Sequence, residues 1–563
     1  MKALGQANAL QKLIERTHQL LQLYYHKQKW PHIIPLISQL SEAYWKLYQN
    51  APHSLQAQLQ LYIKSHGYTT NLVVNQQVLI LVICTQQGFG QQIIEELLAA
   101  GLANYLCVTN ENNALARGEK LNPQAQKQWQ FRHHLAIKLL STTHQPSINL
   151  KHILARLQKY TLALEQQVPL NLYDQKTLIV ALAELIARKI TPSSAAGCSL
   201  QQALAQTYLE SKQSKAQTLI RSIVSVLSFP FPGQLTKYKQ YHAFCLHHQD
   251  GQTRLCVFND KKQFQLVTTN TPLQFKSLPV TLADPILCYG IWFADKTEPQ
   301  VESDNADTQL TQLQQAILAL GQHEFVRYQH IEKTLDDHPQ IISRLQIAAS
   351  QYNKQQQKAA NLRHSLTMVG LDNAALLCQR VLLESALEHF SHPLMAELQA
   401  RYSSTLKVIT VYAKAHTQHH FEQLASPFTA FLLFILSHYN AQLRWQIPLT
   451  DGQHSELPVS YGLIYGIQSY DKQTLTKLFH SWFTKSANHN AFLVSELDNK
   501  SAVKGLAASL VFIKLATYKL LMPEAELSAW QTALIQQQLK ELMLPSFEHF
   551  QEQVLALGPY NPI

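Results

Sequence analysis

The sequence predicts a mainly α-helical protein made of two large helical bundles, with a small β appendage between them. Apolar residues recur at three- and four-residue spacing over long stretches, as at Leu10, Leu13 and Ile14, which is the period of an amphipathic helix. Only 17 glycines occur in 563 residues, and the summed helix propensity of the Gln-, Leu- and Ala-rich stretches is high. The chain is also too long for one ordinary hydrophobic core, so we expect two large domains.

The composition is that of a folded protein with no concentrated basic face. Hydrophobic residues make up 46% and charged residues 15% of the chain, which is far from the balance of disordered proteins. The formal charge of +10 comes from Lys and Arg residues that never form a run of five. Nucleic-acid binding is therefore unlikely on charge distribution, although a nucleic-acid-binding regulator stays open as an alternative.

The cysteines and the apolar stretches predict a cytoplasmic protein. The seven cysteines are widely spaced and never form a CxxC pair, so we expect reduced thiols. Polar residues interrupt the N-terminal segment, and no secretion signal is expected there. The most apolar stretches, Val78–Cys84 and Phe428–Leu436, are shorter than the roughly 18 residues of a membrane span. We expect both to lie in core helices, without membrane insertion.

Five segments follow one another along the chain. Short β-branched or aromatic runs at Tyr241–Leu246, Leu255–Phe258 and Phe264–Val267, with Asp250-Gly251 between the first two, predict strands and a hairpin. Residues 295–309 are acidic and nearly devoid of apolar side chains, which predicts a linker. The expected organisation is an N-terminal helical segment (1–67), a helical domain (68–228), a small β extension (229–294), the acidic linker (295–309) and a second helical domain (310–563).

Residues from about 68 to 270 resemble the HD-GYP family, bacterial phosphohydrolases of helical fold usually directed at cyclic di-GMP. The matching segments are Tyr68–Asn75, Ala99–Val108 running on to Gly118-Glu-Lys-Leu121, Arg132–Leu140, Leu178–Ala187 and the closing Phe229-Pro-Phe-Pro-Gly233. The GYP signature itself is missing. The resemblance implies a helical HD-superfamily fold for this part of the chain.

This resemblance also implies that the metal-binding residues have been replaced. The positions of the family's ligands are occupied by Leu72, Ala103, Asn104, Arg132 and Ala183. Leucine and alanine have no donor atom, asparagine offers only a neutral amide, and arginine repels a cation. We therefore expect no enzyme activity, no metal and no cofactor.

Residues from about 310 to 500 resemble the HDOD family, non-catalytic relatives of the HD fold. The matching segments are Pro339–Ser350 and Leu362–Leu371, with Ala349 where the family has Asn, and Leu432–Ile435 where it has its core segment. HDOD domains are associated with signalling and regulatory proteins. Both helical bundles are thus expected to be HD-superfamily-like.

Arg132, His133 and His134 are the candidate binding residues, because a guanidinium matches phosphate geometry. They predict a phosphate or nucleotide contact in the former metal pocket, and the competing interpretation is an arginine paired with a carboxylate. Two other sets are interpreted as structural. The histidines 416, 419 and 420 are spaced for one helical face and more probably form a solvated face than a metal site. Tyr461, Tyr465 and Tyr470 are expected to pack with their hydroxyls outward.

The function predicted from these observations is that of a non-catalytic regulatory or scaffold protein of bacterial signal transduction. Its expected partner is another protein, with a cyclic dinucleotide as a possible ligand. Two alternatives remain open. One is a residual or altered cyclic-dinucleotide phosphodiesterase, and the other is the nucleic-acid-binding regulator.

Overall fold

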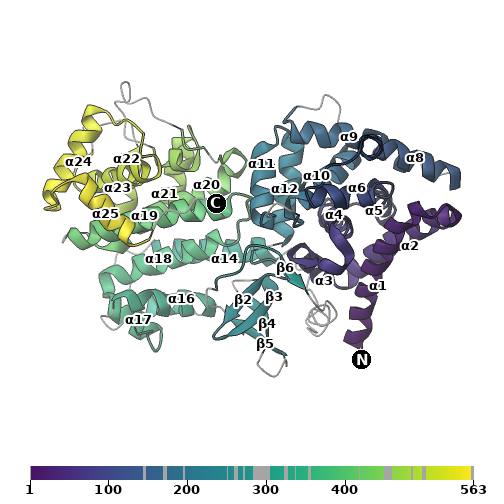
Figure 1. The fold of residues 1–563 in the computed structure, drawn as a ribbon. Helices are drawn as coiled ribbons and strands as arrows, with labels where there is room; N and C mark the ends of the chain where they lie inside the picture. Colours follow the sequence, from purple (N-terminus) through teal and green to yellow (C-terminus); the bar gives the residue numbers. More distant parts are fainter. Residues whose placement is uncertain are drawn as a thin grey trace. The chain divides into compact units, whose positions relative to one another are not determined.

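The chain forms two compact units, Met1–Gln300 and Val301–Ile563, shown in Figure 1. The structure is a computed structural model that describes residues 2–143, 148–168, 174–193, 197–227, 229–249, 252–258, 264–269, 273–282, 305–321, 328–335, 338–352, 357–416, 419–444, 446–448, 460–483, 486–496 and 503–558. Helix accounts for 73% and strand for 7% of the structure. The prediction of a mainly helical protein with small sheets is confirmed.

Unit 1 consists of helices followed by a small antiparallel sheet. Its helices are α1 (Lys2–Gln22), α2 (Ile33–Asn50), α3 (Pro52–Gln56), α4 (Gly67–Gln86), α5 (Gln91–Asn104), α6 (Thr109–Ala116), α7 (Pro123–Gln130), α8 (Arg132–Thr143), α9 (Ile148–Glu165), α10 (Gln175–Ile190), α11 (Leu200–Glu210) and α12 (Ser214–Leu227). The N-terminal helices belong to the same body, because α1 packs on α2 and α4 while α2 packs on α5.

Helix α4 is the centre of unit 1. Its residues Val78–Cys84 are all fully buried, and α1, α5, α10 and α12 pack around it. Polar residues in its first half bind neighbours directly: the Asn75 amide donates to Thr191 Oγ1 (2.9 Å) and the Gln76 amide to the Val180 carbonyl (3.2 Å). These hydrogen bonds satisfy groups that would otherwise cost about 1–3 kcal/mol each in the core.

Helix α4 with the turn before it (Lys64–Gln86) is also long and apolar enough to cross a membrane, and α17 with α18 reaches that length only as one bent span. Within the described residues, 89% of the most apolar window of Lys64–Gln86 is buried inside the protein. A core helix of a soluble protein has this same property. The expected absence of membrane insertion remains a prediction.

The β region follows the helices of unit 1. Strands β2 (Leu235–Tyr238), β3 (Tyr241–Gln249), β4 (Gln252–Phe258) and β5 (Phe264–Thr269) form an antiparallel sheet in sequential order. Three of these strands lie where the sequence predicts them. The proposed hairpin turn Asp250-Gly251 lies outside the described residues, but Gln249 pairs with Gln252 on either side of it. One face of the sheet packs on Ala57 and Leu61 of the helical part.

Three strands were not anticipated from the sequence. They are β2, the short β6 (Val280–Leu282) and β1 (Leu61–Ile63), which lies inside the segment expected to be wholly helical. Strand β1 pairs in parallel with β6 (Val280–Leu282), and the side chain of Asn71 on α4 bonds both the N–H and the carbonyl of Ile63, each at 2.9 Å. This contact holds the short strand against the central helix.

Unit 2 is helical throughout its described residues. Its helices are α14 (Asn305–Gly321), α15 (Tyr328–Leu335), α16 (Pro339–Ala349), α17 (Leu362–Val369), α18 (Leu371–Leu387), α19 (Met395–Ala415), α20 (Phe421–His438), α21 (Lys472–Trp482), α22 (Ala487–Glu496), α23 (Leu506–Leu521), α24 (Ala529–Glu541) and α25 (Phe547–Ala556). Helices α20 and α23 are its most buried elements, and the predicted core stretch Phe428–Leu436 lies in α20 with almost no exposure.

Two sequence expectations for unit 2 are wrong in detail. The apolar spacing from Leu362 to Leu387 predicts a continuous helical pattern, but the pattern is interrupted, since α17 ends at Val369 and Gly370 has a φ of +83°. The acidic linker expected at 295–309 lies partly outside the described residues, and its last part is helical because α14 begins at Asn305. A helix can begin among polar residues when the apolar residues that anchor it follow later, as they do here.

Gly233 joins the sheet to the helical part of unit 1 at a point of close backbone approach. Its φ is +88°, and its N–H donates to the Cys245 carbonyl (2.9 Å). A Cβ built on Gly233 would lie 2.7 Å from the Ala57 carbonyl oxygen and 3.0 Å from the Ala57 Cα. Both the dihedral angle and the missing side chain are therefore required here.

We predict that Gly233→Ala destabilises the protein more than a left-handed φ alone would. Gly88→Ala is the matched control, because Gly88 has a φ of +69° with no atom within 4 Å of a built Cβ. The control should cost about 1 kcal/mol, and Gly233→Ala about 1–3 kcal/mol more because it forces two backbone segments apart. Urea denaturation followed by circular dichroism measures the difference. Equal losses for the two variants would contradict the close approach.

Candidate functional site

The five positions singled out by the sequence resemblance lie on helices that pack against one another. Leu72 is on α4, Ala103 and Asn104 end α5, Arg132 begins α8, and Ala183 is on α10. Helix α4 packs on α5 and α10, and α5 packs on α8 and α10. Leu72, Ala103, Asn104 and Ala183 are fully buried, and Arg132 is 8% exposed.

A buried carboxylate, Glu184, is the centre of the polar groups in this region. The Tyr105 hydroxyl donates to Glu184 Oε1 at 2.7 Å, and the Thr161 hydroxyl donates to Oε2 at 3.3 Å. Arg132 Nη2 lies 3.7 Å and Arg188 Nε 3.9 Å from Oε1. We call Glu184, Tyr105, Thr161, Arg132 and Arg188 the Glu184 cluster.

Glu184 is ionised at neutral pH. Burial by itself would raise the pKa of this carboxyl, but the positive charges of Arg188 and Arg132 and the Tyr105 hydrogen bond outweigh burial and hold the pKa below its ordinary value. The two guanidinium groups come from different places, since Arg188 follows Glu184 by one turn of α10 and Arg132 is on α8. The cluster therefore ties α8 to α10 through charge.

Arg132 is enclosed by aromatic rings as well as by its counter-charge. Its guanidinium carbon lies 4.7 Å from the Trp129 ring centroid and 6.0 Å from that of Tyr105, and Nη1 donates to the Trp129 carbonyl (3.3 Å). An incoming phosphate would have to compete with Glu184 for this guanidinium. The arrangement matches the interpretation of an arginine paired with a carboxylate, although the carboxylate is buried rather than on the surface.

His133 lies in the same buried region and is neutral. Its Nε2 lies 2.9 Å from Asn104 Oδ1. Burial, with the positive charge of Arg132 adding to it, lowers the pKa of His133 to about 3. His134, the third predicted contact residue, is exposed and lies edge-on to Phe131. The structure thus brings Arg132 and His133 together with Asn104 and leaves His134 outside.

Three buried donors in or beside the Glu184 cluster have no hydrogen-bond acceptor within the described part of the chain. They are Asn104 Nδ2, Arg132 Nε and Arg188 Nε. Such groups usually bind water or a ligand. Across the described residues, no group of three or more His, Cys, Asp or Glu side chains is placed to hold a metal ion. The chemistry that the cluster offers is recognition of a small acceptor group.

Unit 2 contains buried carboxylates arranged in the same manner. Glu422 on α20 accepts from Arg380 Nε (2.6 Å) and from the Tyr352 hydroxyl (2.9 Å). Glu496 at the end of α22 accepts from Lys514 and Tyr470, and from the Ser460 hydroxyl at 3.0 Å. Glu422 joins α20 to α18, and Glu496 joins α22 to the following helix α23.

The other residues considered from the sequence have structural positions. Helix α19 ends at Ala415, so the histidines 416, 419 and 420 do not share a helical face, which corrects the expectation; His416 and His419 stack at 4.6 Å and His420 caps α20. Tyr461 and Tyr465 are fully buried, with their hydroxyls 2.9 Å apart. They pack as expected, but those hydroxyls point inward because the core supplies their partners.

Sequence reasoning did not identify Glu184, Tyr105 or Arg188. One signal was available for Glu184, which is the only charged residue in the apolar run from Leu178 to Ala187. A lone carboxylate in a helix that is otherwise apolar on all sides must be buried with a partner. The identity of that partner depends on the packing of α8 and α10, which the sequence pattern does not specify.

Comparisons of this chain with protein-family models, with curated proteins and with solved structures found no match. The site is therefore interpreted from its own geometry.

We predict that Glu184→Gln destabilises unit 1 strongly. The amide has the same shape but no charge, so it leaves the buried guanidinium of Arg132 without its counter-charge, which typically costs about 3–5 kcal/mol. Arg188 is half-buried and keeps Glu165 as a second partner. Glu119→Gln is the control, because Glu119 pairs with Arg117 on the surface and should leave stability nearly unchanged. Urea denaturation measures both. A loss for Glu184→Gln as small as that of the control would show that the cluster is not a buried ion pair.

We predict that His133 makes stability depend on acid pH. Its pKa of about 3 in the folded protein lies below the ordinary histidine value of about 6.5, so the stabilisation is complete above pH 6.5 and is lost as pH falls toward 3. His133→Gln should remove up to about 1.4 kcal/mol per pH unit from the slope of the unfolding free energy in this window. His134→Gln, one position along α8, controls for loss of an imidazole. Identical slopes for wild type and His133→Gln would contradict the assignment.

Proposed function

We propose that this protein is a non-catalytic regulatory or scaffold protein of bacterial signal transduction, built from two HD-superfamily-like helical modules. The observation that carries the proposal is the Glu184 cluster. In an HD-superfamily enzyme, these helices would carry the metal ligands. In this chain, the corresponding positions carry apolar side chains that pack in the core and an arginine that pairs with Glu184. Such a site favours binding over hydrolysis.

The chemistry of the replaced residues supports this proposal. Hydrolysis of a phosphodiester in this superfamily requires a metal to activate water and to neutralise charge on the phosphoryl oxygens. Leu72, Ala103 and Ala183 contribute only buried hydrocarbon. The guanidinium of Arg132 would repel a cation, and it already has Glu184 as its partner.

Unit 2 supports the same interpretation for the second module. Ala349, which stands where the HDOD family has Asn, is fully buried at the end of α16. The segment Leu432–Ile435 lies within the buried part of α20. The Glu422–Arg380 pair connects α20 to α18. These residues stabilise a helical core, and none of them is an exposed reactive group.

A cyclic dinucleotide is the second candidate ligand. The observation that favours it is the set of buried donors, Asn104 Nδ2, Arg132 Nε and Arg188 Nε, that lack acceptors in the described chain. A phosphate oxygen is an acceptor that fits such donors. The competing charge of Glu184 weakens this candidate relative to protein binding.

We predict that the full-length protein releases no product from cyclic di-GMP in the presence of Mn²⁺ or Fe²⁺ and retains no stoichiometric metal after purification. Calorimetric titration with cyclic di-GMP should give a dissociation constant above about 1 mM, which corresponds to about 4 kcal/mol. Product release or one bound metal per chain would contradict the non-catalytic proposal. Binding in the micromolar range that is lost in Arg132→Gln would instead favour the nucleotide-binding candidate.

The protein partner is sought by affinity purification of the tagged full chain from its native cytosol, followed by mass spectrometry. The expected result is a reproducible protein partner at near-stoichiometric amount. Recovery of nucleic acid alone, with an affinity that falls steeply with salt, would favour the nucleic-acid alternative instead.

A further inference from the structure

The C-terminal hairpin of unit 2 differs in charge from the rest of the chain. Residues 523–558 contain five glutamates, one lysine and no arginine, a formal charge of −4 within a chain of +10. This segment includes α24, α25 and the turn before α24. An acidic surface on a basic protein selects against anionic partners at that place.

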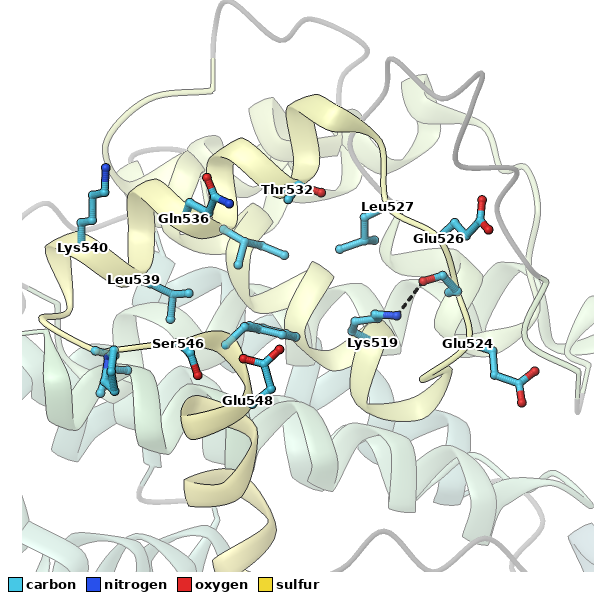
Figure 2. Close-up of a pocket in the computed structure, with 15 residues that line it drawn as sticks. Lys519, Glu524, Glu526, Leu527, Thr532, Gln536, Leu539, Lys540, Ser546 and Glu548 are labelled. Carbon is cyan, nitrogen blue, oxygen red and sulfur yellow. Dashed lines mark hydrogen bonds between the residues drawn. The ribbon is translucent and has the colours of Figure 1, made fainter.

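A groove of about 800 Å³ lies in this acidic hairpin, between the end of α23, the turn before α24, helix α24 itself and the start of α25. Figure 2 shows the residues that line it. Its apolar lining is continuous along α24 and into α25, and consists of Ala525, Leu527, Ile535, Leu539, Leu544, Pro545 and Phe547. We call this the α24–α25 groove.

Three carboxylates stand at the rim of the α24–α25 groove without a counter-charge. Glu524, Glu526 and Glu548 line it, and none of them forms an ion pair with a described residue. Lys519 also lines the groove, but its ammonium donates to the carbonyls of Pro523 and Ala525 and forms no ion pair with the three carboxylates. With Lys540, the lining contains three carboxylates and two ammonium groups, so its net charge is negative. Lys540 lies at the opposite end of the groove from Glu524 and Glu526 (Figure 2).

Met543 is an exposed apolar residue next to the groove in the sequence, although it is not one of the lining residues. It immediately precedes the lining residue Leu544, and at 91% exposure it is the most exposed large apolar residue in the described chain. Its φ is +54°, and the bonds from Met543 N to the Lys540 carbonyl and from Leu544 N to the Leu539 carbonyl close the end of α24. Glycine is the usual residue at this position of a helix end.

Met543 lowers the stability of the isolated protein, and no contact within the described chain compensates for this loss. The left-handed conformation is unfavourable for a residue with a Cβ, and the exposed side chain gains nothing from burial. Single exposed apolar residues are common on protein surfaces. This one combines exposure with an unfavourable backbone conformation at the rim of an apolar groove, which indicates a contact made by a partner.

We infer that the α24–α25 groove is a docking site for a basic amphipathic helix of a partner protein, whose apolar face packs on Leu527, Leu544, Phe547 and Met543 and whose Lys or Arg residues reach Glu524, Glu526 and Glu548. The inference builds on the proposed function in one respect, namely that a protein acting by binding needs a docking surface. It names that surface and the chemistry of the partner.

The charge and the extent of the surface decide between this occupant and others. The net negative charge of the groove lining and of residues 523–558 disfavours nucleic acid, anionic lipid headgroups and free phosphate. Exposed Met543 next to the lining residue Leu544 favours a ligand that extends beyond the groove. Helices that dock in grooves present apolar residues at three- and four-residue spacing, and the basic residues beside them provide specificity and a fast association rate.

The test uses the full-length protein and a fluorescein-labelled helical peptide of about five turns, with leucines on one face and lysines on the other. A second peptide has glutamate in place of every lysine. Fluorescence anisotropy at low salt should show saturable binding of the Leu–Lys peptide and at least tenfold weaker binding of the Leu–Glu peptide. A photoreactive group on the apolar face of the Leu–Lys peptide should cross-link to residues 519–548.

The variants test whether the peptide binds in the groove or is attracted nonspecifically to the acidic surface. The triple variant Glu524→Gln, Glu526→Gln, Glu548→Gln should weaken binding of the Leu–Lys peptide about tenfold, whereas Glu552→Gln should change it less than twofold. Glu552 is the matched control because it lies one turn after Glu548 on α25 but does not line the groove. Circular dichroism verifies that each variant is folded.

Met543→Gly distinguishes binding from folding. Glycine relieves the left-handed conformation, so the urea midpoint should rise, while the loss of the apolar side chain should weaken peptide binding about threefold. No saturable binding, equal binding of the triple variant, or cross-links outside residues 519–548 would overturn the inference. These outcomes leave the metal and cyclic di-GMP assays unaffected, because those assays concern unit 1.

Discussion

A buried carboxylate must be neutralised within the protein interior, and this constraint organises both units. Removing such a charge from water costs several kcal/mol, which only close cations and hydrogen-bond donors offset. For three such carboxylates, a cation and a tyrosine hydroxyl approach from other elements of the fold, which restricts how these elements can pack. These carboxylates are Glu184, Glu422 and Glu496, and the tyrosines are Tyr105, Tyr352 and Tyr470. The buried Glu397 instead pairs with Arg401 on its own helix.

The helical class and most of the sheet were predictable because their signals are local. Apolar spacing along α1 and β-branched runs in β3 and β5 depend only on neighbouring residues. Strand β1 was not predictable, because three residues adopt this conformation only when β6 and Asn71 supply their hydrogen bonds. The interruption at Gly370 was missed for another reason: apolar residues continue at helical spacing on both sides of it.

The candidate site was predicted in part. The resemblance to HD-GYP placed Asn104, Arg132 and Ala183 in one region, and they do lie on packed helices. The convergence of Arg132, His133 and His134 was never possible on one helix, because successive residues of an α-helix point about 100° apart. Glu184 was missed since a carboxylate and its arginine partner on another helix leave no shared pattern in the sequence.

The α24–α25 groove and the Glu184 cluster place the same kinds of residue in opposite settings. In the cluster, carboxylate, arginine and aromatic ring contact one another, and Arg132 is almost inaccessible, although its Nε lacks an acceptor among the described residues. In the groove, the carboxylates and partly exposed apolar side chains such as Leu544 and Phe547 are available to another molecule. The first arrangement stabilises the fold. In the second, the exposed groups lower the free energy only when a partner binds to them.

The parallel pairing of β1 with β6 has a consequence for biosynthesis. It joins a strand near the beginning of unit 1 to one near its end. A nascent chain emerges from the ribosome in order, so α1 to α12 can assemble while β1 still lacks its neighbour. Closing this long loop is an entropically slow step. The hydrogen-bonding edge of β1 is therefore unpaired through most of the translation of unit 1. During this time, a chaperone that binds extended segments could bind β1.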